Sequence, residues 1–257
     1  LDQGDCWVEY EDLLDRANEL LVMDCLDSRE QIERHLDNLI DEKALTCYCA
    51  DSRFLVAKPF IRRMEEDLAR VFADGAKPSP CLGDKPDLQT EIKRIAPRLN
   101  PRQTKAAVNA AAHSISLISG GAGSGKTFTI SAITRLCEER DLRVVLCAPT
   151  GKAAKRMEEA TGREASTIHR LLGFNGKTYA RDSEDPISAD MLIVDEVSMV
   201  DVVLAWHLFQ AIDLDRTTVV LVGDHNQLPP VGPGNILRDL IESRALPTTL
   251  LDDVVRQ

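Results

Sequence analysis

The chain has 257 residues, of which 44% are hydrophobic, so it can bury one full α/β core together with a smaller module. No apolar run approaches the ~20 residues that span a membrane, and the first residues have neither the basic nor the apolar region of a secretion signal. We therefore expect no membrane partner. The net charge of −11 also argues against a protein whose whole surface binds a polyanion.

The distribution of charge and the spacing of the cysteines indicate where nucleic acid could bind and what state the thiols are in. Residues 1–90 carry 11 Lys and Arg against 21 Asp and Glu, whereas residues 91–257 carry 20 against 21, so a local contact with nucleic acid is expected in the second part. The seven cysteines include no CxxC pair, which favours ordinary reduced thiols over a zinc site or a disulfide framework. Reduced thiols predict a cytoplasmic location.

The first part of the chain predicts a small, mostly helical domain over residues 1–76. Leucines recur at helical spacing up to Leu26, and a second amphipathic helix follows. Two short strand-like runs at 44–49 and 53–57 then precede a third helix that Pro59 begins. This order resembles a winged-helix module. Because the second helix is rich in acidic residues, packing or docking to a protein partner is favoured over DNA binding.

A polar stretch rich in Pro and Gly at 75–87 predicts a flexible connection, and we place the linker at 77–96. The second domain then covers 97–257 and opens with the residues LNPRQ before a helix. The last of these, Gln103, can both accept a hydrogen bond from adenine and donate one to it. It becomes a candidate adenine contact because a phosphate-binding motif follows.

That motif is the stretch SISLISGGAGSGKT at 114–127, which joins an apolar strand, a glycine-rich turn and the start of a helix as a P-loop does. Glycines permit positive φ and let backbone N–H groups turn toward a phosphate at the helix N-terminus. Lys126 can reach the β- and γ-phosphate oxygens, and the Thr127 hydroxyl can coordinate Mg²⁺. ATP and Mg²⁺ are therefore the expected cofactors. The predicted nucleotide contacts are Gln103, Gly121, Gly123, Ser124, Gly125, Lys126, Thr127 and Phe128.

Two polar segments that follow apolar runs are candidates for the rest of the site. In MLIVDEVSM, Asp195 is placed to hold Mg²⁺ and Glu196 to polarise the attacking water. In VGDHNQLPPVGPGN, the amide of Gln227 can bond both a γ-phosphate oxygen and that water. Adjacent acids and polar turns are common in loops, so each signal depends on the P-loop upstream.

Strand and helix candidates alternate through the second domain, which predicts an α/β fold with a parallel sheet of the P-loop NTPase kind. The strand candidates lie at 114–119, 143–148, 191–194 and 218–222, and the helix candidates at 126–140, 151–160 and 200–211. In CAPTGKAAKRM, Thr150 at a helix start can hold a phosphate of an extended strand, with Lys152 beside it. A charged, solvent-facing helix is the alternative.

Taken together and in order, the blocks LNPRQ, GGAGSGKT, APTGKAAKRM, STIHRLLG, LIVDEVSMVD, VGDHNQLPPVGPGN and a terminal RQ resemble RecD-like superfamily 1 DNA helicases, the relatives of the exonuclease V alpha subunit. The resemblance implies a RecA-like motor domain with Lys126, Glu196, Gln227 and Arg256 as catalytic residues, and Thr127 and Asp195 as Mg²⁺ ligands. It also places Thr150, Lys152, Thr167 and His169 on segments that contact single-stranded DNA, although His169 beside two leucines is as well explained by packing.

The resemblance further implies ATP-dependent 5′→3′ translocation on single-stranded DNA in recombination and repair. It suggests a hairpin at 173–186, near the position of the small strand-separating pin in the family. Because family members carry a second RecA-like domain and this chain begins without Met, we expect a fragment with weak or no ATPase activity. Two alternatives stay open: a nucleotide-gated module that docks a protein through its acidic domain, and the helicase part of a conjugative relaxase.

Overall fold

The computed structural model describes residues 4–21, 28–50, 52–82 and 87–251. Its N-terminal part contains two helices, α1 (Tyr10–Leu21) and α2 (Ser28–Asp41), and a hairpin of β2 (Thr46–Ala50) and β3 (Arg53–Ala57). A short strand, β1 (Val8–Glu9), pairs with β3 and gives a three-stranded antiparallel sheet of order β1-β3-β2. The predicted order of helices and strands is confirmed here, whereas the likeness to a winged helix stays a prediction. The end of the first helix predicted near Leu26 lies outside the described residues.

The larger part of the chain is built on a six-stranded parallel sheet of order β6-β5-β7-β8-β4-β9. The four predicted strands form its inner part, and two short, more polar strands at the edges escaped prediction because they contain no apolar run. The inner strands are β4 (Ile115–Ser119), β5 (Val144–Ala148), β7 (Met191–Val194) and β8 (Thr218–Gly223), and the edge strands are β6 (Ala165–Thr167) and β9 (Thr248–Leu250).

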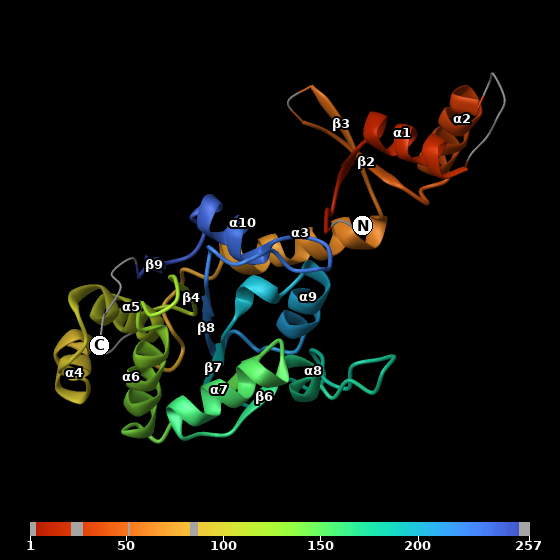
Figure 1. The fold of residues 1–257 in the computed structure, drawn as a ribbon. Helices are drawn as coiled ribbons and strands as arrows, with labels where there is room; N and C mark the ends of the chain where they lie inside the picture. The colour runs from red at the N-terminus through yellow and green to blue at the C-terminus, as the bar shows by residue number, and fades with distance from the viewer. Residues whose placement is uncertain (1–3, 22–27, 51, 83–86, 252–257) are drawn as a thin grey trace.

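Helices cover both faces of this sheet, as Figure 1 shows. One face carries α4 (Leu88–Ile95), α5 (Pro101–Ala112), α6 (Lys126–Glu138) and α7 (Gly151–Thr161). The other carries α3 (Pro59–Ala73), α8 (Ile168–Leu171), α9 (Val202–Gln210) and α10 (Ile236–Ser243), together with the one-turn helix η1 (Val197–Met199). The predicted α/β architecture with a parallel sheet is therefore confirmed.

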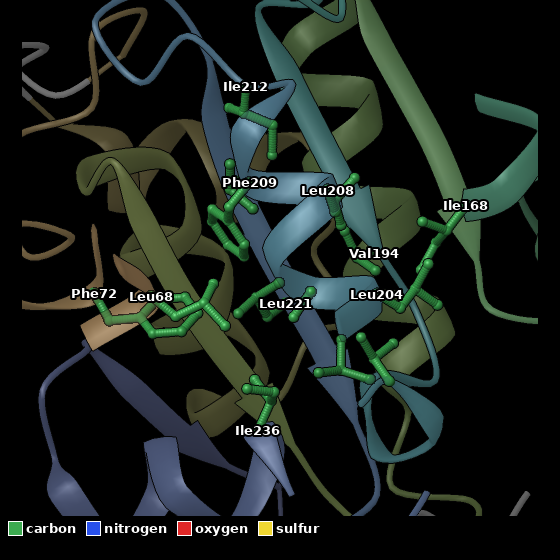
Figure 2. Packing of buried hydrophobic residues seen from close by; sticks show 14 of the residues in the cluster. Leu68, Phe72, Ile168, Val194, Leu204, Leu208, Phe209, Ile212, Leu221 and Ile236 are labelled. Carbon is green, nitrogen blue, oxygen red and sulfur yellow. The ribbon is translucent and has the colours of Figure 1, made fainter. Parts of the chain in front are cut away.

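Successive side chains of each strand point to opposite faces of the sheet, and both faces are packed with apolar side chains. In β8, Val219 and Leu221 point into the cluster with α3 and α9, whereas Val220 and Val222 point into the cluster with α5 and α6. Successive residues of a strand face opposite sides, so a strand covered on both faces is apolar at most of its positions. Figure 2 shows the first of these clusters, in which Leu221 lies among side chains from α9 and α3.

The third helix of the N-terminal part, α3, packs on the large sheet's helix layer. The ring of Phe72 meets Phe209 of α9 edge-on, with centroids 4.9 Å apart, and the indole N–H of Trp206 donates to Asp67 at 3.0 Å. The predicted linker at 77–96 contains the whole of α4, whose Ile92 is buried in the core of the opposite face. The division into domains stays a prediction, but contacts with the large core already begin at α3.

The stretch 173–186, which the structure describes in full, contains no strand, but the backbone N–H of Asn175 donates to the Thr178 carbonyl at 3.2 Å across a turn, so the possible hairpin stays a prediction. The side chain of Asn175 accepts from the backbone N–H groups of Lys177 and Thr178, both at 3.0 Å, and closes the turn. The ring of Tyr179 then stacks on His207 of α9, with centroids 4.1 Å apart. Local Asx bonding and ring packing hold this stretch in place.

Within the part of the chain that the structure describes, no helix is both long and apolar enough to cross a membrane.

Replacing Phe72 by Ala tests whether α3 belongs to the main core. We expect a loss of about 3 to 5 kcal/mol in the free energy of unfolding, because a 5% exposed ring is removed from a packed cluster. Phe60 lies on the same helix but is 50% exposed, so Phe60→Ala should cost less than about 1 kcal/mol. Urea unfolding followed by circular dichroism measures both, and equal losses would show that α3 does not contribute to the core.

Candidate functional site

The P-loop connects β4 to α6 and has the backbone that its glycines were predicted to allow. Gly123 and Gly125 adopt positive φ angles of 77° and 85°. A Cβ at Gly125 would displace the side-chain amide of Gln103, and the positive φ would strain any other residue at this position. The conformation of the loop therefore depends on its glycines and on the buried side-chain amide of Gln103 packed against it.

The polar groups of the P-loop are arranged as an anion site requires. The ammonium group of Lys126 donates to the carbonyl oxygens of Gly120 and Gly121, the latter at 3.1 Å, and so lies over the loop. The hydroxyl of Ser124 is buried and has no hydrogen-bond partner among the described residues, which leaves a donor free within the loop. Thr127 and Phe128 are exposed at the first turn of α6.

Gln103 ties the P-loop to α5. It forms a capping box with Asn100. The side-chain oxygen Oε1 of Gln103 accepts from the backbone N–H of Asn100 at 3.0 Å, and the backbone N–H of Gln103 donates to the side-chain oxygen of Asn100 at 2.8 Å. The side-chain nitrogen Nε2 of Gln103 donates to the backbone carbonyl of Ser124 at 3.1 Å. The side chain is only 3% exposed, but its oxygen keeps one acceptor position and its nitrogen one donor.

Asp195 and Glu196 follow β7 at the same edge of the sheet. Burial raises the pKa of the Asp195 carboxyl to about 6; the charge of Glu196 adds to this rise, and the Glu196 N–H and the ammonium of Lys126 oppose it. That N–H donates to the Asp195 carboxylate at 2.8 Å. Glu196 itself has a left-handed backbone with φ of 57°, which is uncommon outside glycine. A buried carboxylate facing Lys126 suits a cation that neutralises it.

The loop after β8 meets the acid pair directly. The amide nitrogen of Gln227 donates to the Glu196 carboxylate at 3.1 Å, and its oxygen accepts from the Ser198 hydroxyl at 3.1 Å. Two predicted catalytic residues that are 31 positions apart in sequence are thereby in contact. They come together because β7 and β8 are neighbouring parallel strands whose carboxyl ends share one edge.

The residues predicted to contact DNA lie after β5 and at the carboxyl end of β6. The hydroxyls of Thr150 and Thr167 cap α7 and α8, accepting backbone N–H groups at 3.2 and 3.1 Å. Lys152 is exposed in the first turn of α7. His169 packs against Phe174, with ring centroids 5.3 Å apart, as the packing alternative expects. The predicted catalytic residue Arg256 lies outside the described residues.

Sequence reasoning missed two polar residues of the site, Ser198 and His225. Ser198 lies three positions after Asp195 within the same quoted motif, so its proximity to the acid pair was available as a signal. His225 is different, because its ring nitrogen Nδ1 bonds the hydroxyl of Ser119, 106 positions earlier, at 2.8 Å. Nothing in the local pattern indicates that pairing, which needs the order of the strands.

Comparisons with known proteins agree with this geometry. The family model described as AAA domain matches residues 103–233. The ATP-dependent RecD2 DNA helicase of Deinococcus radiodurans is 40% identical, with 77% of this chain and 27% of that protein covered. The RecBCD enzyme subunit RecD of Mycobacterium tuberculosis is 32% identical, with 79% and 38% covered.

Among solved structures, the Pif1 helicase from Candida albicans matches with a TM-score of 0.45 and 23% identity, over 62% of this chain and 41% of that one. The chain thus spans well under half the length of the relatives named here. The family match covers just over half of the chain and includes the P-loop, the acid pair and Gln227. The family match shows that the chain belongs to the AAA domain family, and over most of its length the chain is similar to the two RecD-type proteins named above.

Proposed function

We propose that the protein carrying this chain is a DNA helicase that couples ATP hydrolysis to 5′→3′ movement along single-stranded DNA in recombination and repair. The observation that carries the proposal is the contact between Gln227 and Glu196 at 3.1 Å, at the sheet edge where the P-loop begins. A phosphate sensor bonded to the residue that polarises water is the arrangement that links nucleotide state to hydrolysis. The direction of movement and the pathway rest on family resemblance.

The residues present fit a nucleotide with a divalent cation. Lys126 would neutralise phosphate oxygens, and the free Ser124 hydroxyl and the glycine N–H groups would bind them. Thr127 and Asp195 would hold Mg²⁺, which would neutralise the developing charge on the phosphates. Glu196 would orient the attacking water and accept its proton, while Gln227 would hold the γ-phosphate. Arg256 would add a second positive charge.

The DNA track would follow the basic helix after β5. Lys152 and Lys155 are exposed on α7, the latter at 78%, and Thr150 lies at that helix's N-terminus. In a chain of net charge −11, such a basic face favours contact with phosphates. The decisive experiment measures ATP hydrolysis and duplex unwinding with DNA tails of 5′ and 3′ polarity. Absence of single-strand-stimulated hydrolysis, or unwinding from 3′ tails alone, would contradict the proposal.

A second role is favoured by the acidic N-terminal part, which also exposes Leu20 at 82% and Leu21 at 58%. Exposed leucines beside acidic residues suit docking to a protein partner rather than to DNA. A partner retained by the whole chain and lost on removing residues 1–57, a cut that keeps α3 (Pro59–Ala73) in place, with DNA absent, would support this role. A cytoplasmic location stays a prediction from the free thiols.

Lys126→Ala should weaken binding of Mg·ATP by about 10- to 100-fold, because the charged hydrogen bonds to phosphate are lost. Titration calorimetry with a slowly hydrolysed ATP analogue measures the change. Lys93→Ala removes an exposed lysine of α4 and should leave the affinity unaltered. Equal affinities for both variants would refute the assignment of the P-loop lysine.

Gln103→Ala should lower the preference for ATP over GTP, since a bidentate contact to adenine is worth about 1 to 3 kcal/mol of base discrimination. Competition between the two nucleotides measures this preference. Asn100→Ala is the matched control, because it breaks the same capping box without touching the base. If both variants changed the preference equally, Gln103 would act through the cap and not through adenine.

Asp195→Asn should stabilise the nucleotide-free protein at pH 8 by about 1 to 3 kcal/mol, because the raised pKa of about 6 means that ionised Asp195 destabilises the fold. The contribution of this group to stability is present below pH ~4 and lost as the pH rises through ~6. The gap between the variants should therefore shrink on acidification. Thermal unfolding from pH 8 to pH 4 in a chelator measures it, and a gap that does not depend on pH would contradict the burial of the charge.

A further inference from the structure

The turn Asp224–Gln227 after β8 carries the proposed phosphate sensor, and its shape is set internally. The Asp224 carboxylate accepts from the Asn226 N–H at 2.9 Å, and the Asp224 carbonyl accepts from the Gln227 N–H at 3.1 Å. An Asp that bonds the backbone two residues on is a standard device for closing such turns. The internal bonds hold the turn together but do not set its position against the P-loop.

Two side chains of the turn reach in different directions. Gln227 bonds Glu196 and Ser198 on the β7 side. His225 bonds the Ser119 hydroxyl through Nδ1 at 2.8 Å on the β4 side. The turn is therefore held between the strand that precedes the P-loop and the strand that precedes the acid pair.

Ser119 is a firm attachment point for His225. It is the last residue of β4, is fully buried at 0% exposure, and pairs in register with Gly223 of β8. Its carbonyl accepts the Leu251 N–H at 2.7 Å, so its backbone is bonded toward β9 as well. The next residue, Gly120, opens the P-loop and donates its N–H to the Gly223 carbonyl at 3.2 Å.

We propose that His225 is a positioning residue which, through Ser119, sets the distance between the P-loop and Gln227 and so sharpens the discrimination between nucleoside triphosphate and diphosphate. The inference rests on the proposed function, because it assumes that Gln227 contacts a γ-phosphate. The P-loop fixes the β-phosphate, and the His225–Ser119 hydrogen bond fixes the sensor relative to it. Losing that bond leaves Gln227 held from the β7 side alone, by Glu196 and Ser198, so its distance from the P-loop is less well defined while the diphosphate contacts stay intact.

The test compares the affinities of the chain for Mg·ATPγS and Mg·ADP by titration calorimetry. His225→Ala should weaken ATPγS binding by about two- to tenfold, the effect of one hydrogen bond, and leave ADP binding unaltered. Ser119→Ala should have the same effect, and the double variant should be no weaker than either single one, because both remove one interaction. His113→Ala is the matched control, since its ring bonds Asn109 at 3.1 Å just before β4 begins, at the opposite end of that strand.

Two conservative variants identify the atom that acts. Asn at position 225 can place a hydrogen-bonding group where Nδ1 lies, whereas Gln places one nearer to Nε2. We expect His225→Asn to restore the discrimination and His225→Gln to leave it impaired. Thermal unfolding of each variant shows whether the turn is intact. A purely structural role would lower the unfolding temperature without altering the ratio of the two affinities.

The outcomes separate the inference from the function on which it rests. If the unaltered chain bound both nucleotides and His225→Ala left their affinity ratio unchanged, the positioning role would be overturned and the proposed function would stand. Rescue by Gln and not Asn would also overturn it, since Nε2 would then act directly on a ligand in the cavity that His225 and Gln227 both line. If the unaltered chain bound neither nucleotide, the proposed function would fail and the inference with it.

Discussion

The adjacency of β7, β8 and β4 in one parallel sheet is the constraint on which the candidate site depends. Parallel strands end at the same edge, so the acid pair, the sensor turn and the P-loop are brought together although they are far apart in sequence. Hydrogen bonds between side chains of successive loops then fix the spacing. A change in strand order would leave every local motif intact and still destroy the site.

Much of this architecture follows from the residue pattern, and the exceptions have physical causes. The inner strands are apolar at most positions because both faces are covered, which makes them easy to recognise. The edge strands β6 and β9 have only three residues each and include polar ones, so no such signal exists. The stretch 173–186 contains no strand, and the contact of the Tyr179 ring with His207, which is a long-range contact, has no local signal in the sequence.

In the candidate site, too, some residues could be predicted from the local sequence, whereas others have partners that are distant in the sequence. The turn of the P-loop could be predicted because its glycines and Lys126 act through neighbouring backbone, and Gly123 and Gly125 have the positive φ angles that such a turn needs. Only part of the role of Gln103 could be predicted. A sequence motif suggests an adenine contact, whereas the capping box and the hydrogen bond to Ser124 depend on helix geometry. His225 could not be predicted, because its partner Ser119 becomes a neighbour only when β4 and β8 pair.

The packing of α3 on α9 means that chain order and structural unit do not coincide. Leu68 and Phe72 are 3% and 5% exposed because α3 acts as an outer helix of the sheet that follows it in sequence. Cutting the chain at residue 76 would strip this helix away and bare the apolar face of α9 and α10 to water. The core around the large sheet is therefore stabilised by residues that the sequence pattern assigned to another domain, and any evolutionary exchange of the N-terminal part would have to keep α3.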